Sequence, residues 1–298
     1  MKQQKKVKNK IGGDRVTDIV INTILILLSI VTLYPLWYVI IASFSGADAV
    51  KNGEVFLWIK DLNLDAYKNA LADATILTGY RNSMIYLFVG TLMMLFVTLP
   101  CAYALSRKNL KGRRFWNLFF LITMYFSGGL VPTYLLHSSI GWINTPWVLL
   151  IPGCVNVYYM ILARSSFQEM PESLHDAAII DGASEFYYFI KIVLPLSKAV
   201  IATVFLFSAL GWWNSYMPFL IYIRKPEFQS LQVVLRTIFT RYDASMAAMT
   251  PTEFAHAMDK TEMLRFSTAV LASLPFCLLY PFVQKYFNRG VMIGAVKG

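Results

Sequence analysis

The sequence has few charged residues and little of what metal or redox sites need. Only 15% of its 298 residues are Asp, Glu, Lys or Arg, whereas 57% are hydrophobic. Its cysteines, Cys101, Cys154 and Cys277, form no CxxC pair, and its three histidines are equally scattered. Such spacing excludes a disulfide framework and the common zinc sites. We expect no metal and no cofactor bound by this chain.

Two further absences bear on catalysis. The sequence has no glycine-rich phosphate loop of the Walker type, so hydrolysis of ATP by that mechanism is excluded. It also offers no pairing of a nucleophile with a general base, and no titratable residues that converge at one end of the apolar runs. We therefore expect a protein that is not an enzyme, whether soluble or embedded in a membrane.

Long apolar runs dominate what is present. Uncharged stretches cover 19–45, 82–106, 115–136, 147–163, 199–223 and 266–284. About 20 apolar residues in a helix cross the ~30 Å of a bilayer's hydrocarbon, and the first run is too long for a secretory signal. The pattern predicts an all-α, polytopic integral membrane protein with six transmembrane helices, organised as a single domain over 1–298. The fourth run is the least regular, because it is short and contains Pro152, Gly153 and Asn156.

None of these six runs contains Asp, Glu, Lys, Arg or His. Carriers driven by protons or sodium place such a residue near the middle of the bilayer, because coupling needs a titratable or charged ligand there. Energy for transport must then come from another polypeptide, or the protein is a passive pore.

Basic residues give the orientation. The segments 1–15 and 107–114 hold eleven Lys and Arg, and Lys and Arg near span ends stay on the cytoplasmic side. This places the basic N-terminus 1–15, the segment 164–198 and the tail 285–298 in the cytoplasm, and the loop 224–265 outside. The net charge of +10 is explained by contact with anionic lipid headgroups, so we expect no binding of nucleic acid.

A polar stretch separates the fourth and fifth runs. Pro171 and Glu172 favour the start of a helix, since proline lacks an amide proton and a carboxylate suits the positive end of the dipole. Gly182 can take the left-handed conformation that closes a helix, and Ser184 can cap a second one. Pro195 should end that second helix, because its ring clashes with a continuing turn. The stretch thus predicts a helix, a turn and a second helix.

The same residues stand in a specific frame. The chain reads Asp176-Ala177-Ala178, two residues, Asp181-Gly182-Ala183, five residues, Phe189, two residues, Ile192, one residue and Leu194-Pro195. It resembles the EAA loop of permease subunits of binding-protein-dependent ABC importers, closest to the carbohydrate-uptake group that includes the maltose system. Asp176 stands for a Glu of that pattern and Ala199 for its last Pro.

The resemblance implies a permease subunit in a bacterial cell membrane. Its partners would be a second, homologous permease, two cytoplasmic ATPase subunits that hold ATP and Mg, and an extracellular or periplasmic binding protein that delivers a sugar. It also implies that the residues which couple to an ATPase are Asp176, Ala177, Ala178, Asp181, Gly182, Ala183, Phe189, Leu194 and Pro195. Any single carboxylate of the loop is alternatively part of a solvated face.

Polar and aromatic side chains gather in the fifth run. Indole and phenol rings stack on sugar rings, and a buried amide needs partners that lipid cannot supply. Our hypothesis is a sugar path formed by Trp212, Trp213, Asn214 and Tyr216, with Asn156 and Tyr159 of the fourth run as secondary candidates. The alternative is that the tryptophans pack on a neighbouring helix or anchor at the interface.

The outside loop 224–265 is long for a plain connection. Its apolar residues fit an amphipathic helix: Leu231, Val234, Leu235, Ile238 and Phe239. In the family that the chain resembles, such loops meet the binding protein. A lid over the membrane domain alone is the alternative.

Two other functions stay open at the level of sequence. One is a channel or carrier that works alone, which would transport without ATP and would not need the EAA-like loop. The other is an ABC permease for a different cargo, such as an amino acid or an osmolyte.

Overall fold

The computed structural model describes residues 15–246 and 263–278. Every regular element within them is a helix, as the sequence predicts. Of these residues, 15–68 and 263–270 form one compact unit, and 69–246 and 271–278 form another. The N-terminal segment 1–14, the tail 285–298 and part of the loop 224–265 lie outside the described residues, so their predicted positions stay predictions.

The first unit is built around α1 (Arg15–Ser43) and the short helix α2 (Ala47–Lys51). Most of α1 is exposed, and only its last turns are covered, where Ile41 and Ala42 pack with Val50, Val55 and Met263. A helix whose apolar side chains are exposed along most of its length suits a lipid or protein environment rather than water.

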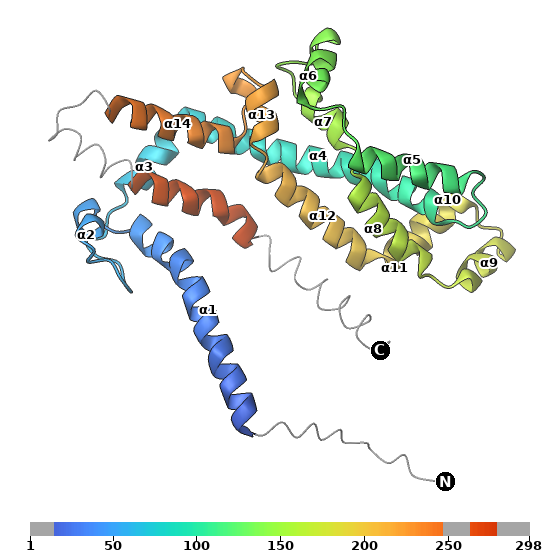
Figure 1. The fold of residues 1–298 in the computed structure, drawn as a ribbon, viewed down its shortest axis with the longest axis horizontal. Helices are drawn as coiled ribbons and strands as arrows, with labels where there is room; N and C mark the ends of the chain where they lie inside the picture. Colours follow the sequence, from blue (N-terminus) through green and yellow to red (C-terminus); the bar gives the residue numbers. More distant parts are fainter. Residues whose placement is uncertain (1–14, 247–262, 279–298) are drawn as a thin grey trace. The chain divides into compact units, whose positions relative to one another are not determined.

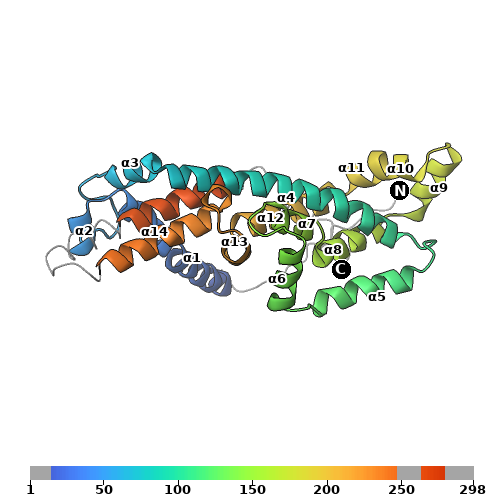
Figure 2. The same ribbon diagram turned by 90° about the horizontal axis from the view of Figure 1, so that it is seen from above.

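The second unit is organised along one long helix. Helix α4 (Ala74–Ser106) follows α3 (Asp65–Ala72) and begins where the Asp73 side chain accepts a hydrogen bond of 2.7 Å from the Thr75 amide. It packs against α8, α12 and α14, which lie beside it in both views (Figures 1 and 2). The helices that follow α4 are α5 (Arg113–Tyr125), α6 (Leu130–Ser139), α7 (Trp147–Gly153), α8 (Val157–Gln168), α9 (Glu172–Ile180), α10 (Glu185–Tyr188), a π-helical turn (Phe189–Val193), α11 (Leu194–Leu196), α12 (Lys198–Trp213), α13 (Met217–Tyr222), a 3₁₀ turn (Pro226–Phe228) and α14 (Leu231–Met246).

Glycines let neighbours approach α4 closely. A Cβ added at Gly79 would lie 3.0 Å from a methyl carbon of Val234 on α14, and one at Gly90 would overlap the Trp212 ring on α12. Helix α14 is the helix predicted in the loop 224–265, so that prediction is confirmed. It packs on α4, and Gly79 allows the close approach of the two helices.

The apolar helices match the predicted spans only in part. Within the described residues, three helical stretches are long and apolar enough to cross a membrane: Thr17–Ser43, Ala74–Ser106 and Trp147–Gln168. Two further pairs are bent, by 105° between α5 and α6 and by 80° between Glu185–Leu196 and Lys198–Trp213. The structure is thus that of an all-helical protein with several membrane-compatible helices, and the number six stays a prediction.

The helical stretches also reach beyond the uncharged runs. Helix α4 includes Arg81, and α8 continues past the predicted end of the fourth span to include Arg164. The helical structure of the fourth run is interrupted, because α7 ends at Gly153 and the Asn156 side chain caps α8. A run free of charges therefore predicts the centre of a helix better than its ends.

The glycine packing yields a stability test. Gly90→Ala should lower the free energy of unfolding by ~1–3 kcal/mol, because the new methyl group has no room against Trp212. Gly211→Ala is the matched control on α12, where nothing lies within 4 Å of an added Cβ, and it should leave stability unchanged or raise it by up to ~1 kcal/mol. Denaturant unfolding in detergent, followed by circular dichroism, measures both. Equal effects of the two substitutions would contradict the close approach.

Candidate functional site: the helix α9 and its contacts with α4

Helix α9 begins and ends as its sequence requires. It starts at Glu172, directly after Pro171, and its last turn is closed by Gly182, which has a φ of +80°. The Gly182 amide donates to the Ile179 carbonyl (3.0 Å), and the Ala183 amide donates to the Ala178 carbonyl (2.9 Å). This pair of bonds is the Schellman closure, in which glycine takes the left-handed position without strain.

The second helix also begins as predicted. Ser184 caps α10, because its side chain accepts a hydrogen bond of 3.2 Å from the Tyr187 amide. The prediction that Pro195 ends this helix was wrong. The chain passes through a π turn at Phe189–Val193 and stays helical to Leu196. The wider π turn accommodates the proline ring, and the sharp bend comes two residues later.

The predicted coupling residues divide into a buried and an exposed set. Ala178 and Phe189 are buried in a core that also contains Leu99, Ala102 and Phe167, and Ala183 and Leu194 pack partly against it. The remaining predicted residues are exposed: Asp176, Ala177, Asp181, Gly182 and Pro195. The two alanines of the motif therefore differ, since Ala178 fills the chain's own core and Ala177 faces outward.

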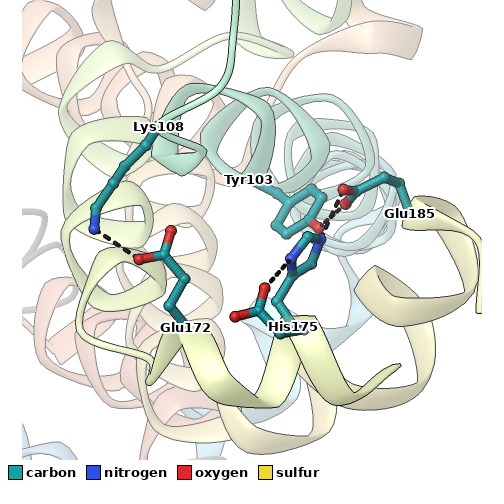
Figure 3. Close-up of polar contacts among 6 residues, drawn as sticks. Tyr103, Lys108, Glu172, His175 and Glu185 are labelled. Carbon is teal, nitrogen blue, oxygen red and sulfur yellow. Dashed lines mark hydrogen bonds and ion pairs between the residues drawn. The ribbon is translucent and has the colours of Figure 1, made fainter. Parts of the chain in front are cut away.

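Polar contacts tie this region to the end of α4 (Figure 3). The Tyr103 hydroxyl donates to one oxygen of Glu185 (2.5 Å), and His175 donates from Nε2 to the other (2.8 Å). The second ring nitrogen of His175 lies 3.7 Å from the Asp176 carboxylate. On the other side, Lys108 pairs with Glu172 at 2.8 Å.

Charge in the region is balanced by these contacts. The hydrogen bond and positive charge of Lys108 hold the pKa of Glu172 below its usual value. Partial burial raises the pKa of Glu185, but the hydrogen bonds from Tyr103 and His175 outweigh it and leave that pKa lowered. The guanidinium of Arg107 lies 5.9 Å from the ring centres of both Tyr103 and Tyr188. Both carboxylates are therefore held in their charged forms at neutral pH.

Apolar packing and polar contacts contribute differently to the attachment of α9. Burying a side chain such as Phe189 stabilises the fold by ~1.5–3 kcal/mol, whereas an exposed pair such as Lys108 and Glu172 is screened by water and contributes little. The core therefore supplies the strength of the attachment, and the polar contacts fix its orientation. What results is a short helix that exposes Leu174, Ala177 and Ile180 and is firmly joined to α4.

Sequence reasoning missed the residues that form these polar contacts, Tyr103, Lys108 and His175. The opposite charges of the segment 107–114 and of the polar stretch were a usable sign that Lys108 and Glu172 would pair. Tyr103 gave no such sign, because it stands in an apolar run. His175 was noted only as an isolated histidine, although with Glu185 it links the two helices of the turn.

The two tryptophans of the hypothetical sugar path are largely committed to packing. Trp213 is 2% exposed, donates from its indole to the Ala272 carbonyl (3.0 Å) and contacts the rings of Tyr80 and Phe276. Trp212 is half-buried between Gly90 and Gly153 and lies parallel to the ring of Tyr86. The packing alternative therefore describes Trp213 well and Trp212 in part.

The other path candidates are more accessible. Asn214 is exposed where α12 ends, and Tyr216 is half-buried under the guanidinium of Arg236 (5.2 Å). Asn156 uses its carbonyl oxygen to cap α8 at the Tyr159 amide (3.1 Å), and Tyr159 is half-buried. Since Trp212 touches Gly153 just before Asn156, the structure brings the break between α7 and α8 close to the end of α12.

The family model for the binding-protein-dependent transport system inner membrane component matches residues 74–293. This range includes α9 and all the residues that contact it in the descriptions above. The chain belongs to this family. It is accordingly a multi-pass protein of the bacterial inner membrane and a transport subunit rather than an enzyme. Membership also implies a substrate-binding protein and an ATPase as partners.

Within the described residues, no group of three or more His, Cys, Asp or Glu is placed to hold a metal ion.

Relatives of this permease family cover nearly the whole chain. Protein LplC of Bacillus subtilis is 37% identical over 90% of each chain. A polygalacturonan/rhamnogalacturonan transport system permease, YtcP, from the same organism is 34% identical over 96% of this chain and 99% of its own. Among solved structures, a chain of a bacterial ABC transporter that imports the acidic polysaccharide alginate superposes with a TM-score of 0.82 and 32% identity, over 92% of this chain and 97% of its own. The fold is therefore that of an ABC permease.

The lowered pKa values of Glu172 and Glu185 predict that the orientation of α9 on its core is acid-sensitive. A carboxylate whose folded pKa is depressed contributes stability above its unfolded pKa of about 4.3, and that stability is lost as the pH falls through the folded value. A spin label at exposed Ser173 should therefore be immobile from pH 7 to pH 5 and gain mobility below about pH 4.

The control for this titration removes the titrating groups. In the double variant Glu172→Gln, Glu185→Gln, the label should be more mobile at every pH and show no acid step. Circular dichroism at each pH verifies that the helices persist. An acid step of equal size in the double variant would contradict the role of the two carboxylates.

Proposed function

We propose that this chain is one permease subunit of an ATP-driven importer for an oligosaccharide. The observation that carries the proposal is the structural likeness, over 92% of this chain, to a chain of the alginate importer. Relatives named for polygalacturonan/rhamnogalacturonan and maltodextrin transport support it. The proposed complex contains a second permease, two ATPase subunits and an external binding protein. Cargo of another class, such as an amino acid or an osmolyte, has no comparable support.

The proposed topology has six spans with both termini in the cytoplasm. Two contacts support it, because each joins segments that the charge rule assigns to one side. The pair of Lys108 and Glu172 joins two predicted cytoplasmic segments. The Asn144 side chain accepts a hydrogen bond of 2.6 Å from the Arg224 amide. This contact joins the loop 224–265 to the segment 137–146, which the same charge rule also places outside. An orientation in which 107–114 and α9 lie on opposite sides is incompatible with the first contact.

The proposed coupling step uses α9 as the part that an ATPase grips. Its exposed face enters a cleft of the ATPase, and the core around Tyr188 and Phe189 passes the movement to α4. Helix α4 in turn packs on α8, α12 and α14, so that much of the second unit moves with it. ATP and Mg are held by the ATPases, and this chain binds no cofactor.

The proposed sugar path is narrower than the sequence hypothesis. Asn214, Tyr216 and Tyr159 keep accessible polar groups near the two helix breaks, whereas Trp213 is engaged in packing. We place Trp212 at the edge of the path, where one face of its ring is covered by glycines.

The cargo is tested with the reconstituted complex of both permeases, the ATPases and the binding protein. Saccharides of graded length, neutral and acidic, are compared for stimulation of ATP hydrolysis and for uptake into vesicles. We expect an oligosaccharide to stimulate both. Stimulation by an amino acid or an osmolyte alone would contradict the proposed cargo.

The two alanines of the motif separate coupling from folding. Ala177→Leu should fold with unchanged stability but lose most transport and ATPase association, because Ala177 is on the exposed face. Ala178→Leu should instead lower the free energy of unfolding by ~1–3 kcal/mol, because Ala178 is 6% exposed in the core. Unfolding and co-purification of the ATPase are measured for both. Normal uptake by the Ala177 variant would contradict the docking of this face.

A further inference from the structure

Helices α5 and α8 line an open cavity of about 410 Å³ that lies apart from the proposed sugar path residues. Its polar lining consists of Arg114, Asn117 and Arg164, and the rest is apolar, with Leu118, Leu121 and Met160 among the side chains. The cavity lies at the end of α5 that adjoins the basic segment 107–114, on the side that we propose to be cytoplasmic.

Arg164 is held in place in this cavity but is not neutralised. Arg164 donates to the Asn117 carbonyl oxygen, and the Asn117 amide donates to the Arg113 carbonyl (2.8 Å). The Nε atom of Arg164 is fully buried, and none of the described residues accepts its hydrogen bond. Arg113 is turned away to the Leu105 carbonyl (3.2 Å).

Positive charge accumulates here without a counter-charge. The ion pairs found among the described residues involve neither Arg114 nor Arg164. Arg164 is half-buried, and its buried Nε–H without an acceptor among the described residues is costly. Arg114 lies in the first turn of α5, and Arg164 of α8 reaches Asn117 near the same end. This is the positive end of the α5 dipole, where an anion is favoured. The site is therefore complementary to an anion with several acceptor oxygens.

We propose that this cavity binds the phosphate of an anionic phospholipid, with an acyl chain along its apolar wall. Arginine recognises phosphate through parallel N–H donors, and the cytoplasmic leaflet supplies anionic headgroups at this depth. The apolar lining favours a lipid over a free anion, because Leu118 and Leu121 are 54% and 41% exposed on a helix compatible with a membrane. A soluble phosphate would gain nothing from them.

The test uses the assembled importer in nanodiscs of equal phosphatidylglycerol and phosphatidylcholine, followed by native mass spectrometry of the lipids that stay bound. We expect phosphatidylglycerol to be retained preferentially. Arg114→Gln and Arg164→Gln should each lower the ratio of the two retained lipids roughly fivefold, the effect of losing one basic contact. Lys111→Gln removes the same charge from an exposed position in the same segment and should leave the ratio unchanged.

Three results would overturn the proposal. Equal retention of both lipids would show no headgroup preference, and equal ratios in all three variants would place the preference elsewhere. Displacement of phosphatidylglycerol by millimolar glycerol phosphate alone would identify a site for a soluble anion. Arg114→Gln keeps the test decisive if Arg164→Gln does not fold, because Arg114 is exposed. None of these outcomes depends on the cargo of the importer.

Discussion

The packing of the α9 and α10 region onto the end of α4 is the interaction on which the rest of the structure depends. Tyr188, Phe189 and Val193 enter a core with residues of α4 and α8, and Tyr103, His175 and Glu185 orient the contact. The apolar core gives the joint its strength, because the polar pairs are exposed enough to be screened. A helix that is both exposed outward and rigidly attached inward can pass on a force.

In the proposed coupling step, the long helix α4 would carry that force, because its neighbours lie close to it. Gly79 admits α14, and Gly90 admits the Trp212 ring of α12, so the contacts follow α4 from its first turns to its middle. In a membrane, helices associate through close packing rather than through the hydrophobic effect, and small residues make that approach possible. The break between α7 and α8 and the end of α12 meet beside this helix. The proposed sugar path therefore adjoins the element that would move.

Sequence reasoning succeeded where a single residue or a short apolar pattern decides the local structure. Gly182 and Ser184 fixed the turn after α9, and the apolar period after Leu231 fixed α14. It failed where tertiary contacts decide. The π turn lets the chain continue past Pro195, and helices run beyond uncharged stretches to include Arg81 and Arg164. Pairings across the chain, such as Tyr103 with Glu185, have no local pattern and could not be predicted. The burial of Trp213 belongs to the same class, since its partners Tyr80, Ala272 and Phe276 all lie far from it in the sequence.

The central claim is that α9 and α4 move as one body when the ATPases close. It is tested most directly by the distance between spin labels at Ser173 on α9 and Leu77 near the start of α4, measured in the assembled importer with and without ATP. A second pair of spin labels, one at Leu77 and one on the partner permease, verifies that the complex has changed state. We expect the Ser173 to Leu77 distance to stay the same while the second distance changes. A shift of α9 relative to α4 in that transition would contradict it.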